Sequence, residues 1–399
     1  MKVLHVIPSI AIEDGGPTFA LFSLVEALGR ANVSITVVTT VDRSETKSKE
    51  HELRARPYLV CFKRNIQAYK VAWRIVPWLL DRVRDFDVVH VHAVFSFTSV
   101  AAALIARWKG VPYVVRPLGV LNRWGIKNRR PMAKRLSYAL LESGILRNAR
   151  MLHFTSSQEA AQAFELDARL QKVPIIILPL PIEIPARLAN HPFLERFPRL
   201  KAGEWVLFLS RFGKQKGLEL LLEAFAALSS RDGRRPMLIL AGGGDEKYVE
   251  SLHAKTTQLG IEHRILWTGY LTGDEKWDAL ESATVFVLPS YSESFGIAAA
   301  EALASGCASV LSEGIPFARD AAAVGGAVVT KCDSESLREA LEQLLGSPME
   351  RERLGRNGRQ FAEEHFSPPA IAATLVNAYA EIAGNVASGH APFDRKPAP

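Results

Sequence analysis

Short apolar, β-branched runs alternate with helix-patterned segments along this chain, and that alternation restricts the fold more than any other feature. Ser34–Thr40 consists of Ser, Ile, Thr and Val and predicts a strand, whereas Thr18–Arg30 carries apolar residues at helical spacing. Continuous apolar strands are typical of parallel sheets that helices cover on both faces. The first half therefore predicts a doubly wound, parallel α/β sheet. The other strands expected there are Lys2–Pro8, Asp87–His92, Pro112–Arg116 and Met151–Thr155.

A proline-rich segment, Leu178–Pro185, separates this pattern from a second one, and dense proline suits a linker. The sequence thus predicts two Rossmann-like domains, 1–182 and 183–368, with a cleft between them at the carboxyl ends of their strands. We expect a last helix, 369–384, to pack back on the first domain, and 385–399 to be a disordered tail. The strands expected in the second domain are Trp205–Ser210, Met237–Ala241, Arg264–Thr268, Val285–Pro289 and Ala308–Leu311.

Charge is distributed unevenly between the two halves. Residues 1–150 hold 24 Lys and Arg against 11 Asp and Glu, a net charge of +13, and residues 151–399 hold 25 against 31, a net charge of −6. A basic half attracts phosphate groups. The three cysteines lie far apart and form neither a disulfide framework nor a metal-type spacing. No apolar run approaches the roughly 20 residues that span a bilayer, so we expect a cytoplasmic or peripheral membrane protein.

The stretch with the most chemical information runs from Leu288 to Gly306 and contains Glu293 and Glu301. Its pattern predicts a buried strand, a polar loop that carries Glu293, and a helix that begins at Gly296. A helix start attracts anions, and a carboxylate beside it suits hydrogen bonds from hydroxyl groups better than a bare phosphate. The alternative is that Glu293 only caps the helix and Glu301 is a solvated position.

Two glycine-containing loops suit a phosphate group. Arg211 and Lys216 lie between a strand and a helix, where an arginine fork and a lysine point charge can hold a diphosphate. Gly15 and Gly16 occupy the equivalent place in the first domain and let the backbone approach a phosphate. The alternatives are a solvated basic loop and a plain turn.

Two pairs of metal-ligand residue types carry less weight. His90 and His92 lie on one face of an expected strand, but no third ligand has a sensible spacing, which favours hydrogen-bonded histidines over a metal site. Asp85 and Asp87 precede that strand and so lie at the edge of a parallel sheet opposite to its ligand-binding edge. We interpret them as a helix-to-strand turn.

Together these stretches resemble the retaining glycosyltransferases of family 4, which have the GT-B fold. The resemblance covers roughly residues 1–382 and is most specific at Glu293 and Glu301, in the contexts Ser-Glu-Ser-Phe-Gly-Ile and Glu-Ala-Leu-Ala-Ser-Gly. The Arg211/Lys216 loop, the Gly15-Gly16 loop and two further segments support it. These segments are Asp87-Val-Val-His-Val-His92 and Trp267-Thr-Gly-Tyr-Leu271.

The resemblance implies transfer of a sugar from a nucleoside-diphosphate sugar to a hydroxyl group, with retention of configuration and without a metal or cofactor. It implies that Arg211 and Lys216 hold the diphosphate, that Glu293 orients the sugar and that Glu301 binds the ribose. Arg211, Lys216 and Glu293 would be the catalytic residues. The donor-binding residues would be Gly15, Gly16, Arg211, Lys216, Gly269, Tyr270, Leu271, Glu293, Ser294, Phe295, Gly296, Ile297 and Glu301.

The first domain would then bind the acceptor, through His92, Arg116 and Arg123. Many family members carry a His-Gly pair where this chain has Arg116-Pro-Leu-Gly119, so we expect Arg116 to bind an anionic or polar acceptor group.

Cations and aromatic residues are mixed in segments 70–84 and 123–150, and such surfaces suit anionic membranes. The alternative is a solvated basic face with Trp73 and Trp78 in the core. With a membrane, the expected acceptor is a lipid-linked glycan of polysaccharide biosynthesis, on the cytoplasmic face of the inner membrane.

Other classes of protein fit the sequence less well. A nucleotide-dependent oxidoreductase would need Gly-x-Gly-x-x-Gly soon after the first strand, where this chain has Gly15-Gly16-Pro17. A nucleotide-sugar epimerase or a phosphorylase of the same fold, and an inactive binding subunit, remain as alternatives. Despite a pI of about 9.3, no recognised nucleic-acid module is present, so we expect no nucleic-acid partner.

Overall fold

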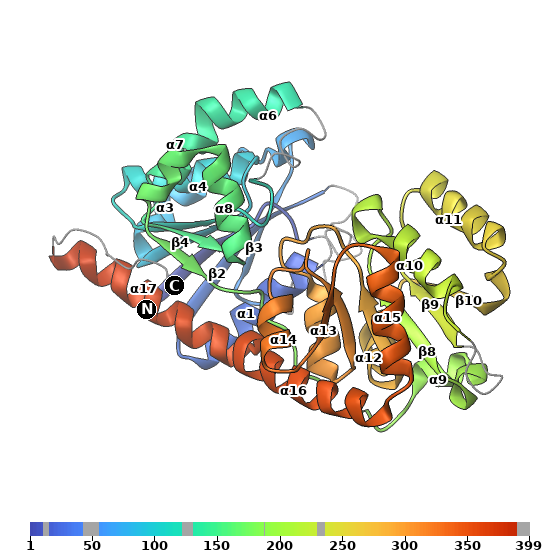
Figure 1. Cartoon of the computed structure of the whole chain (residues 1–399). Coiled ribbons are helices and arrows are strands. Elements are labelled where there is room, and N and C mark those ends of the chain that lie inside the picture. Colours follow the sequence, from blue (N-terminus) through green and yellow to red (C-terminus); the bar gives the residue numbers. More distant parts are fainter. Residues whose placement is uncertain (11–15, 43–55, 122–130, 187, 230–235, 389–399) are drawn as a thin grey trace. The chain divides into compact units, whose positions relative to one another are not determined.

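The computed structural model describes residues 1–10, 16–42, 56–121, 131–186, 188–229 and 236–388 (Figure 1). The chain divides into two compact units. The first unit comprises Met1–Pro181 together with Pro368–Pro399, and the second comprises Ile182–Ser367. The junction between them, residues 178–185, has no regular secondary structure, as its prolines predict.

The first unit is built on a seven-stranded parallel sheet with the order β3-β2-β1-β4-β5-β6-β7. The five strands that the sequence predicts are all present, and the two edge strands were missed. Those edge strands are apolar in sequence but short, with five and three residues, and only half-buried. The strands are β1 (Lys2–Val6), β2 (Ser34–Val41), β3 (Leu59–Lys63), β4 (Val88–His92), β5 (Tyr113–Arg116), β6 (Met151–Phe154) and β7 (Ile175–Ile177).

Helices cover both faces of this sheet. One face packs on α3 (Ile75–Arg82), α4 (Phe97–Trp108), α7 (Ser143–Arg147) and α8 (Ser157–Leu166). The other face packs on α1 (Gly16–Arg30) and α17 (Pro368–Ser388), the last helix of the chain. Helix α6 (Pro131–Ser137) continues through a π-helical turn, η4 (Tyr138–Glu142), into α7. Short 3₁₀ turns complete the unit: η2 (Ala68–Lys70), η3 (Val83–Asp85) and η5 (Ala168–Lys172).

Helix α17 shows why the end of the chain belongs to the first unit. Leu375 and Tyr379 are fully buried against the sheet, and the helix lies along α1 (Figure 1). The prediction of a disordered tail is wrong for residues 385–388, which continue the helix to Ser388. Their composition of small, mostly helix-compatible residues does not stop a helix that is already anchored. The remainder of that predicted tail lies outside the described residues.

The second unit has a six-stranded parallel sheet with the order β10-β9-β8-β11-β12-β13. Five strands were predicted and the edge strand β13 was missed. The strands are β8 (Trp205–Leu209), β9 (Met237–Ala241), β10 (Ile265–Gly269), β11 (Val285–Leu288), β12 (Ser309–Ser312) and β13 (Val328–Thr330). The helices are α9 (Pro192–Arg196), α10 (Leu218–Ala226), α11 (Glu246–Gln258), α12 (Gly273–Ser282), α13 (Ile297–Ser305), α14 (Ala318–Ala323), α15 (Ser334–Leu345) and α16 (Pro348–Phe366).

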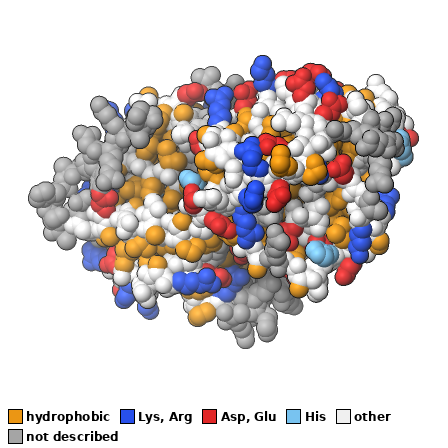
Figure 2. Space-filling view, turned by 60° about the horizontal axis from the view of Figure 1, so that its bottom comes forward, with side chains coloured by type: hydrophobic (Ala, Val, Ile, Leu, Met, Phe, Trp, Pro, Cys, Tyr) orange, Lys and Arg blue, Asp and Glu red, His pale blue; other side chains and the backbone are white. Residues whose placement is uncertain are grey.

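Some surface charges on the second unit are paired within single helices. Arg338 contacts Glu335 and Glu342 on α15, and Arg353 contacts Glu350 on α16. Figure 2 shows a face of the molecule on which basic and acidic side chains are interspersed. Within the described residues, no helix is both long and apolar enough to cross a bilayer.

Candidate active site

The second sheet reverses its strand order between β8 and β11, which are hydrogen-bonded neighbours. From β8 the sheet grows outward through β9 and β10, and from β11 it grows the other way. In open α/β sheets, ligands bind beyond the carboxyl ends of the strands at such a reversal. The loop 210–217 follows β8 and the loop 289–296 follows β11, so both sequence-predicted motifs meet at this point.

An ion pair joins the two loops. Lys216 Nζ lies 2.5 Å from Glu293 Oε1, and the hydroxyl of Ser290 donates to the same oxygen at 2.7 Å. The lysine and glutamate side chains are only 13% and 11% exposed. The site thus places a cation that can bind a phosphate in direct contact with a carboxylate that can bind hydroxyl groups. Sequence analysis identified both charges but missed Ser290, which has no motif of its own.

Glycine is required where the two loops approach each other. Gly217 has φ +67°, and a Cβ there would lie 2.2 Å from the carbonyl oxygen of Pro289. The amide of Tyr291 donates to the carbonyl of Gln215 at 2.9 Å, which locks the loops together. Only a residue without a Cβ allows this close contact. The Lys-Gly sequence in this loop therefore has a geometric reason as well as a chemical one.

Helix α13 begins at the site as the sequence predicts. Gly296 is its N-cap with φ +96°, and no side chain caps the helix. The capping alternative for Glu293 is therefore wrong, since that carboxylate pairs with Lys216 instead. The first N–H groups of α13 have no partner within the helix and suit an anion. Phe295 is buried against Phe317 and Phe366, so this residue holds the loop through its ring.

Glu301 lies one turn inside α13 and pairs with Lys276 of α12 at 2.7 Å. It is partly buried, so the alternative of a solvated position is wrong. Burial raises the pKa of the Glu301 carboxyl, and the charge of Lys276 offsets part of that rise. Sequence analysis missed Lys276, because the two residues are far apart along the chain and only packing of α12 against α13 joins them.

The remaining predicted donor residues take no part in the Lys216–Glu293 and Lys276–Glu301 ion pairs. Arg211 is exposed and has no ion-pair partner in the described part of the chain. Gly269 ends β10 with φ +74°, and Leu271 is buried beyond it. The Tyr270 ring is 67% exposed and lies so close to Gly243 that a Cβ there would be 3.0 Å from it. An exposed aromatic ring beside a glycine turn suits stacking with a planar base.

The first sheet also reverses its order, between β1 and β4, and there the structure places a cluster of imidazoles. His5 of β1 pairs in register with His90 of β4, and His92 pairs in register with Arg116 of β5. All four side chains are buried. His92 and Arg116 were predicted on the acceptor side; the structure places both beneath the surface. Gly16 is the first residue of α1, whereas Gly15 and Arg123 lie outside the described residues.

His5 supplies a third imidazole beside His90 and His92, which the spacing of residues along the sequence did not reveal. Ligand atoms of His5, His90 and His92 lie within 4.8 Å of one another, close enough for one metal ion. The guanidinium of Arg116 adds a buried positive charge that lowers the pKa of each of the three. The same charge opposes a bound cation, so the geometry would admit a metal but the electrostatics disfavour it.

A hydrogen-bond chain connects this cluster to α17. His153 Nε2 lies 2.9 Å from the Leu178 carbonyl, so it donates, and its Nδ1 is left to accept from His90 Nε2 at 3.4 Å. His90 Nδ1 then accepts from the Tyr379 hydroxyl at 2.5 Å. Burial lowers the pKa of every histidine in the cluster, that of His5 to about 3. The imidazoles are therefore neutral near pH 7, and a neutral ring both donates and accepts.

Two family models match the chain. That of the glycosyl transferases group 1 matches residues 195–361, and that of the glycosyl transferase 4-like domain matches residues 15–180. The chain belongs to this glycosyltransferase family. Several curated relatives match at 33–34% identity over 44% of this chain and only 42–44% of their own length.

Two relatives match over more of their length. An O-antigen chain mannosyltransferase C of Escherichia coli is 24% identical over 96% of this chain and 99% of its own. A GDP-mannose:cellobiosyl-diphosphopolyprenol alpha-mannosyltransferase of Xanthomonas campestris is 26% identical over 84% of each. Among solved structures, Anabaena Alr3699/HepE in complex with UDP and glucose superposes with a TM-score of 0.74 at 16% identity, over 96% of this chain and 100% of that one. This last likeness shows the GT-B fold.

Proposed function

We propose that the chain is a retaining, metal-independent glycosyltransferase that moves a sugar from a nucleoside-diphosphate sugar to a hydroxyl group of a lipid-linked glycan. The observation that carries this proposal is the Lys216–Glu293 pair at the strand-order reversal of the second sheet. A phosphate-binding cation and a hydroxyl-binding carboxylate meet there beside an uncapped helix start. A nucleotide sugar presents both partners, a diphosphate and a ring of hydroxyls.

The donor would take the place of the Lys216–Glu293 ion pair. Its diphosphate would pair with Lys216. Arg211 of the loop 210–217 and the first N–H groups of α13 would also contact the diphosphate. Glu293 would then be released to accept hydrogen bonds from sugar hydroxyls. Glu301, paired with Lys276, would accept from the ribose, and Tyr270 would stack on the base. The other donor-side residues, Gly269, Leu271, Ser294, Phe295 and Ile297, would act through backbone or shape.

Charge develops on the diphosphate as the sugar–phosphate bond breaks, while the sugar becomes oxocarbenium-like. Lys216 and Arg211 would stabilise that charge more in the transition state than in the bound donor, which is what accelerates the reaction. The acceptor hydroxyl would attack from the leaving-group face, with a diphosphate oxygen taking its proton. This keeps the anomeric configuration and needs neither metal nor cofactor.

The relatives support a specific first choice of substrates. One full-length relative is named for mannosyl transfer to O-antigen, and the other for GDP-mannose and a diphosphopolyprenol-linked acceptor. We therefore propose GDP-mannose as the donor to test first and a polyprenyl-diphosphate glycan as the acceptor. Such an acceptor places the protein at the cytoplasmic face of a membrane and in cell-surface polysaccharide synthesis. Arg123 remains a proposed acceptor-side residue, and the buried His92 and Arg116 would contribute to the acceptor side only from beneath its surface.

Calorimetric titration with GDP, UDP and ADP, each with and without EDTA, tests the donor site. We expect one nucleotide to bind, with an affinity that EDTA leaves unchanged. Turnover of GDP-mannose with a polyprenyl-diphosphate disaccharide, followed by NMR of the product, tests the reaction and its stereochemistry. Binding of NAD or NADP alone would refute the proposal, and an inverted product would refute retention. Nucleotide binding without turnover of any donor would favour the inactive-subunit alternative.

A further inference from the structure

The helix formed by α6, η4 and α7 (residues 131–147) exposes three apolar side chains on its outer face and buries a glutamate on its inner face. Its glutamate, Glu142, is fully buried, whereas Met132, Leu136 and Leu140 are 83%, 62% and 69% exposed. These three apolar residues are four apart, so they form one stripe along the outer face of the helix. A helix in water normally turns the apolar stripe inward and the charges outward.

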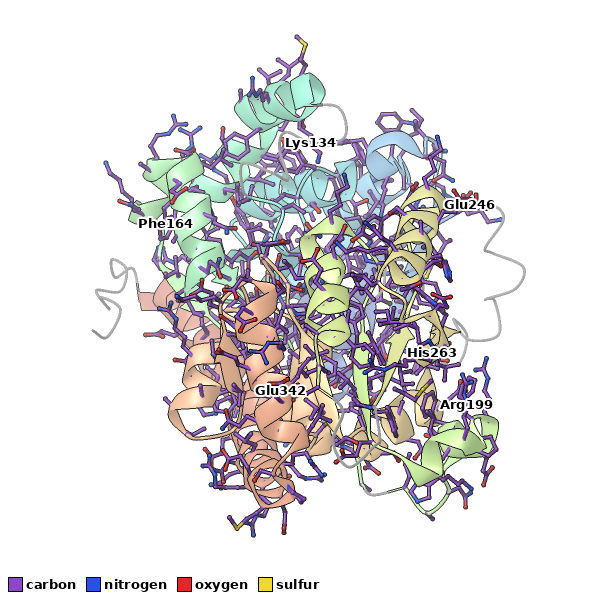
Figure 3. All side chains as sticks on the ribbon, turned by 45° about the vertical axis from the view of Figure 1, so that its right-hand side comes forward. Lys134, Phe164, Arg199, Glu246, His263 and Glu342 are labelled. Carbon is purple, nitrogen blue, oxygen red and sulfur yellow. The ribbon has the colours of Figure 1, made fainter. Side chains whose placement is uncertain are left out.

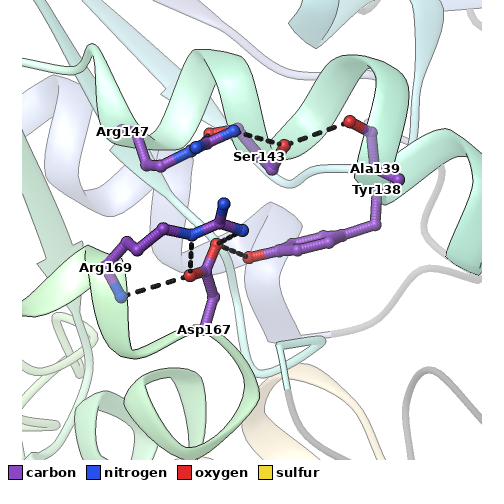
Figure 4. Close-up of polar contacts among 6 residues, drawn as sticks. All are labelled: Tyr138, Ala139, Ser143, Arg147, Asp167 and Arg169. Atoms are coloured by element: carbon purple, nitrogen blue, oxygen red, sulfur yellow. Dashed lines mark hydrogen bonds and ion pairs between the residues drawn. The ribbon is translucent and has the colours of Figure 1, made fainter.

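Specific contacts hold the polar face inward, so the orientation is fixed. Glu142 accepts hydrogen bonds from the hydroxyls of Tyr69 and Ser137. The Tyr138 hydroxyl donates to Asp167, which also pairs with Arg169 (Figure 4). Rotating the helix to bury Leu136 would break the contacts of Glu142 with Tyr69 and of Tyr138 with Asp167. The exposed stripe is thus a stable property of the first unit.

Within the described residues, nothing covers this stripe. Helix α6 packs extensively only against its own continuation, η4. In Figures 1 and 3 it stands at the outer margin of the first unit, beyond α7 and α4, with Lys134 labelled on it. The outer face therefore has room for a large partner.

The charges around the stripe indicate what that partner is. Residues 131–150 contain four cations, Lys134, Arg135, Arg147 and Arg150, and a single acid. That acid is Glu142, which faces inward and is buried, so the outward side carries no carboxylate from this segment. Arg135 and Arg147 are exposed beside the apolar stripe. Apolar side chains flanked by cations suit an interface that is apolar inside and anionic at its surface.

We infer that residues 131–147 dock the protein on an anionic membrane, with Met132, Leu136 and Leu140 inserted among the lipids and the neighbouring cations at the headgroups. The inference deepens the membrane location proposed above and rests on it, but it does not depend on the donor or on the chemistry at Lys216. The structure decides the earlier alternatives for segment 70–84 in part. Trp78 is partly buried and packs on the core with Phe62 and Phe86, whereas Trp73 is exposed.

Flotation of the full chain with vesicles tests the inference. Vesicles of phosphatidylglycerol and phosphatidylethanolamine should carry the protein upward, and phosphatidylcholine vesicles should carry much less. We expect Met132→Glu to lower partitioning at least tenfold. Removing a single nearby cation, as in Arg135→Gln, should lower it about fivefold, from roughly 1 kcal/mol for each cation at an anionic surface. Binding should weaken as salt is raised.

The second unit offers a matched control. Met349 on α16 is 82% exposed, almost as much as Met132, but lies outside the inferred surface. Met349→Glu should float like the unmodified chain. If Met132→Glu does not fold, as judged by circular dichroism, Leu136→Gln provides the same test. The inference is overturned if Met132→Glu floats normally, or if the unmodified chain ignores anionic vesicles and instead forms a dimer that Met132→Glu dissociates.

Failure of this inference and failure of the proposed function give different results. Calorimetric titration of Met132→Glu with the nucleotide found above should return the affinity of the unmodified chain. Loss of flotation with intact nucleotide binding supports the membrane surface. Intact flotation in a chain that binds no nucleotide would leave the membrane surface standing and refute the donor site.

Discussion

The two sheets place opposite kinds of side chains at the same topological position. Where the second sheet reverses between β8 and β11, Lys216 and Glu293 form a partly exposed ion pair. Where the first sheet reverses between β1 and β4, His5 and His90 are buried and uncharged. A charged pair within reach of solvent can exchange its partner for a ligand, whereas a buried neutral network mainly holds elements together.

The difference follows from what covers each sheet. In the first unit, α17 supplies the Tyr379 hydroxyl to His90 and closes the face of the sheet over the imidazoles. In the second unit, the loops around Lys216 are linked by the backbone hydrogen bond from Tyr291 to Gln215, which leaves the charged side chains at the edge. The same strand topology thus serves for docking a terminal helix in one unit and carries the candidate ligand site in the other.

The largest expected effect is an acid-sensitivity of the first unit alone. His5 has a folded pKa of about 3 against 6.5 when unfolded, so the unfolded chain binds the proton first and stability falls as the pH drops below 6.5. This single residue accounts for about 5 kcal/mol between pH 6.5 and 3. Hydrogen exchange followed by mass spectrometry at pH 7 and pH 5 should show lost protection in β1 and β4.

The second unit provides the comparison for that experiment. Carboxyl groups with lowered pKa, such as Asp333 and Glu350, contribute stability that is lost only as the pH falls further, through the acidic range of carboxyl groups. Peptides from β8 and β11 should therefore keep their protection at pH 5. Equal loss of protection in both units would contradict the assignment of acid sensitivity to the buried histidines.

A smaller effect, measured on activity, is expected at the ion pair of the second unit. Lys216→Ala should lower kcat about 100- to 1,000-fold, roughly 3–4 kcal/mol, as for loss of one donor to a developing oxyanion. Lys255 offers a matched control, because it also pairs with a glutamate, Glu223, at 2.5 Å but lies away from the site. Steady-state kinetics should find Lys255→Ala unchanged, and near-normal turnover in Lys216→Ala would disprove the catalytic assignment.

The smallest expected effect is on the stability of the first unit, with nucleotide binding unchanged. Tyr379→Phe removes the hydroxyl that donates to His90 and leaves the Nδ1 atom of a buried imidazole without a donor. The free energy of unfolding should fall by about 1–3 kcal/mol. Urea denaturation measures the loss, and nucleotide affinity should stay the same. A variant as stable as the unmodified chain would show that the hydroxyl does not hold α17 on the sheet.

Much of this architecture could be predicted from local patterns. The central strands of both sheets, the start of α13 at Gly296 and the Lys216 and Glu293 loops all follow from short stretches of sequence. The edge strands β3, β7 and β13 could not, because they are short and half-exposed. Helix α17 extends beyond its predicted end, since its length depends on anchoring to the sheet.

The sequence by itself determined the fold class, the division at the proline-rich junction and the charged residues of the candidate donor site. Periodicity, glycine positions and charge are local properties, so they can be recognised without a structure. Only the tertiary structure decided that Lys276 supports Glu301, that His5 joins His90 and His92, and that Glu142 faces inward while Leu136 faces out. Those relations join residues across separate strands and helices, and packing alone brings them together.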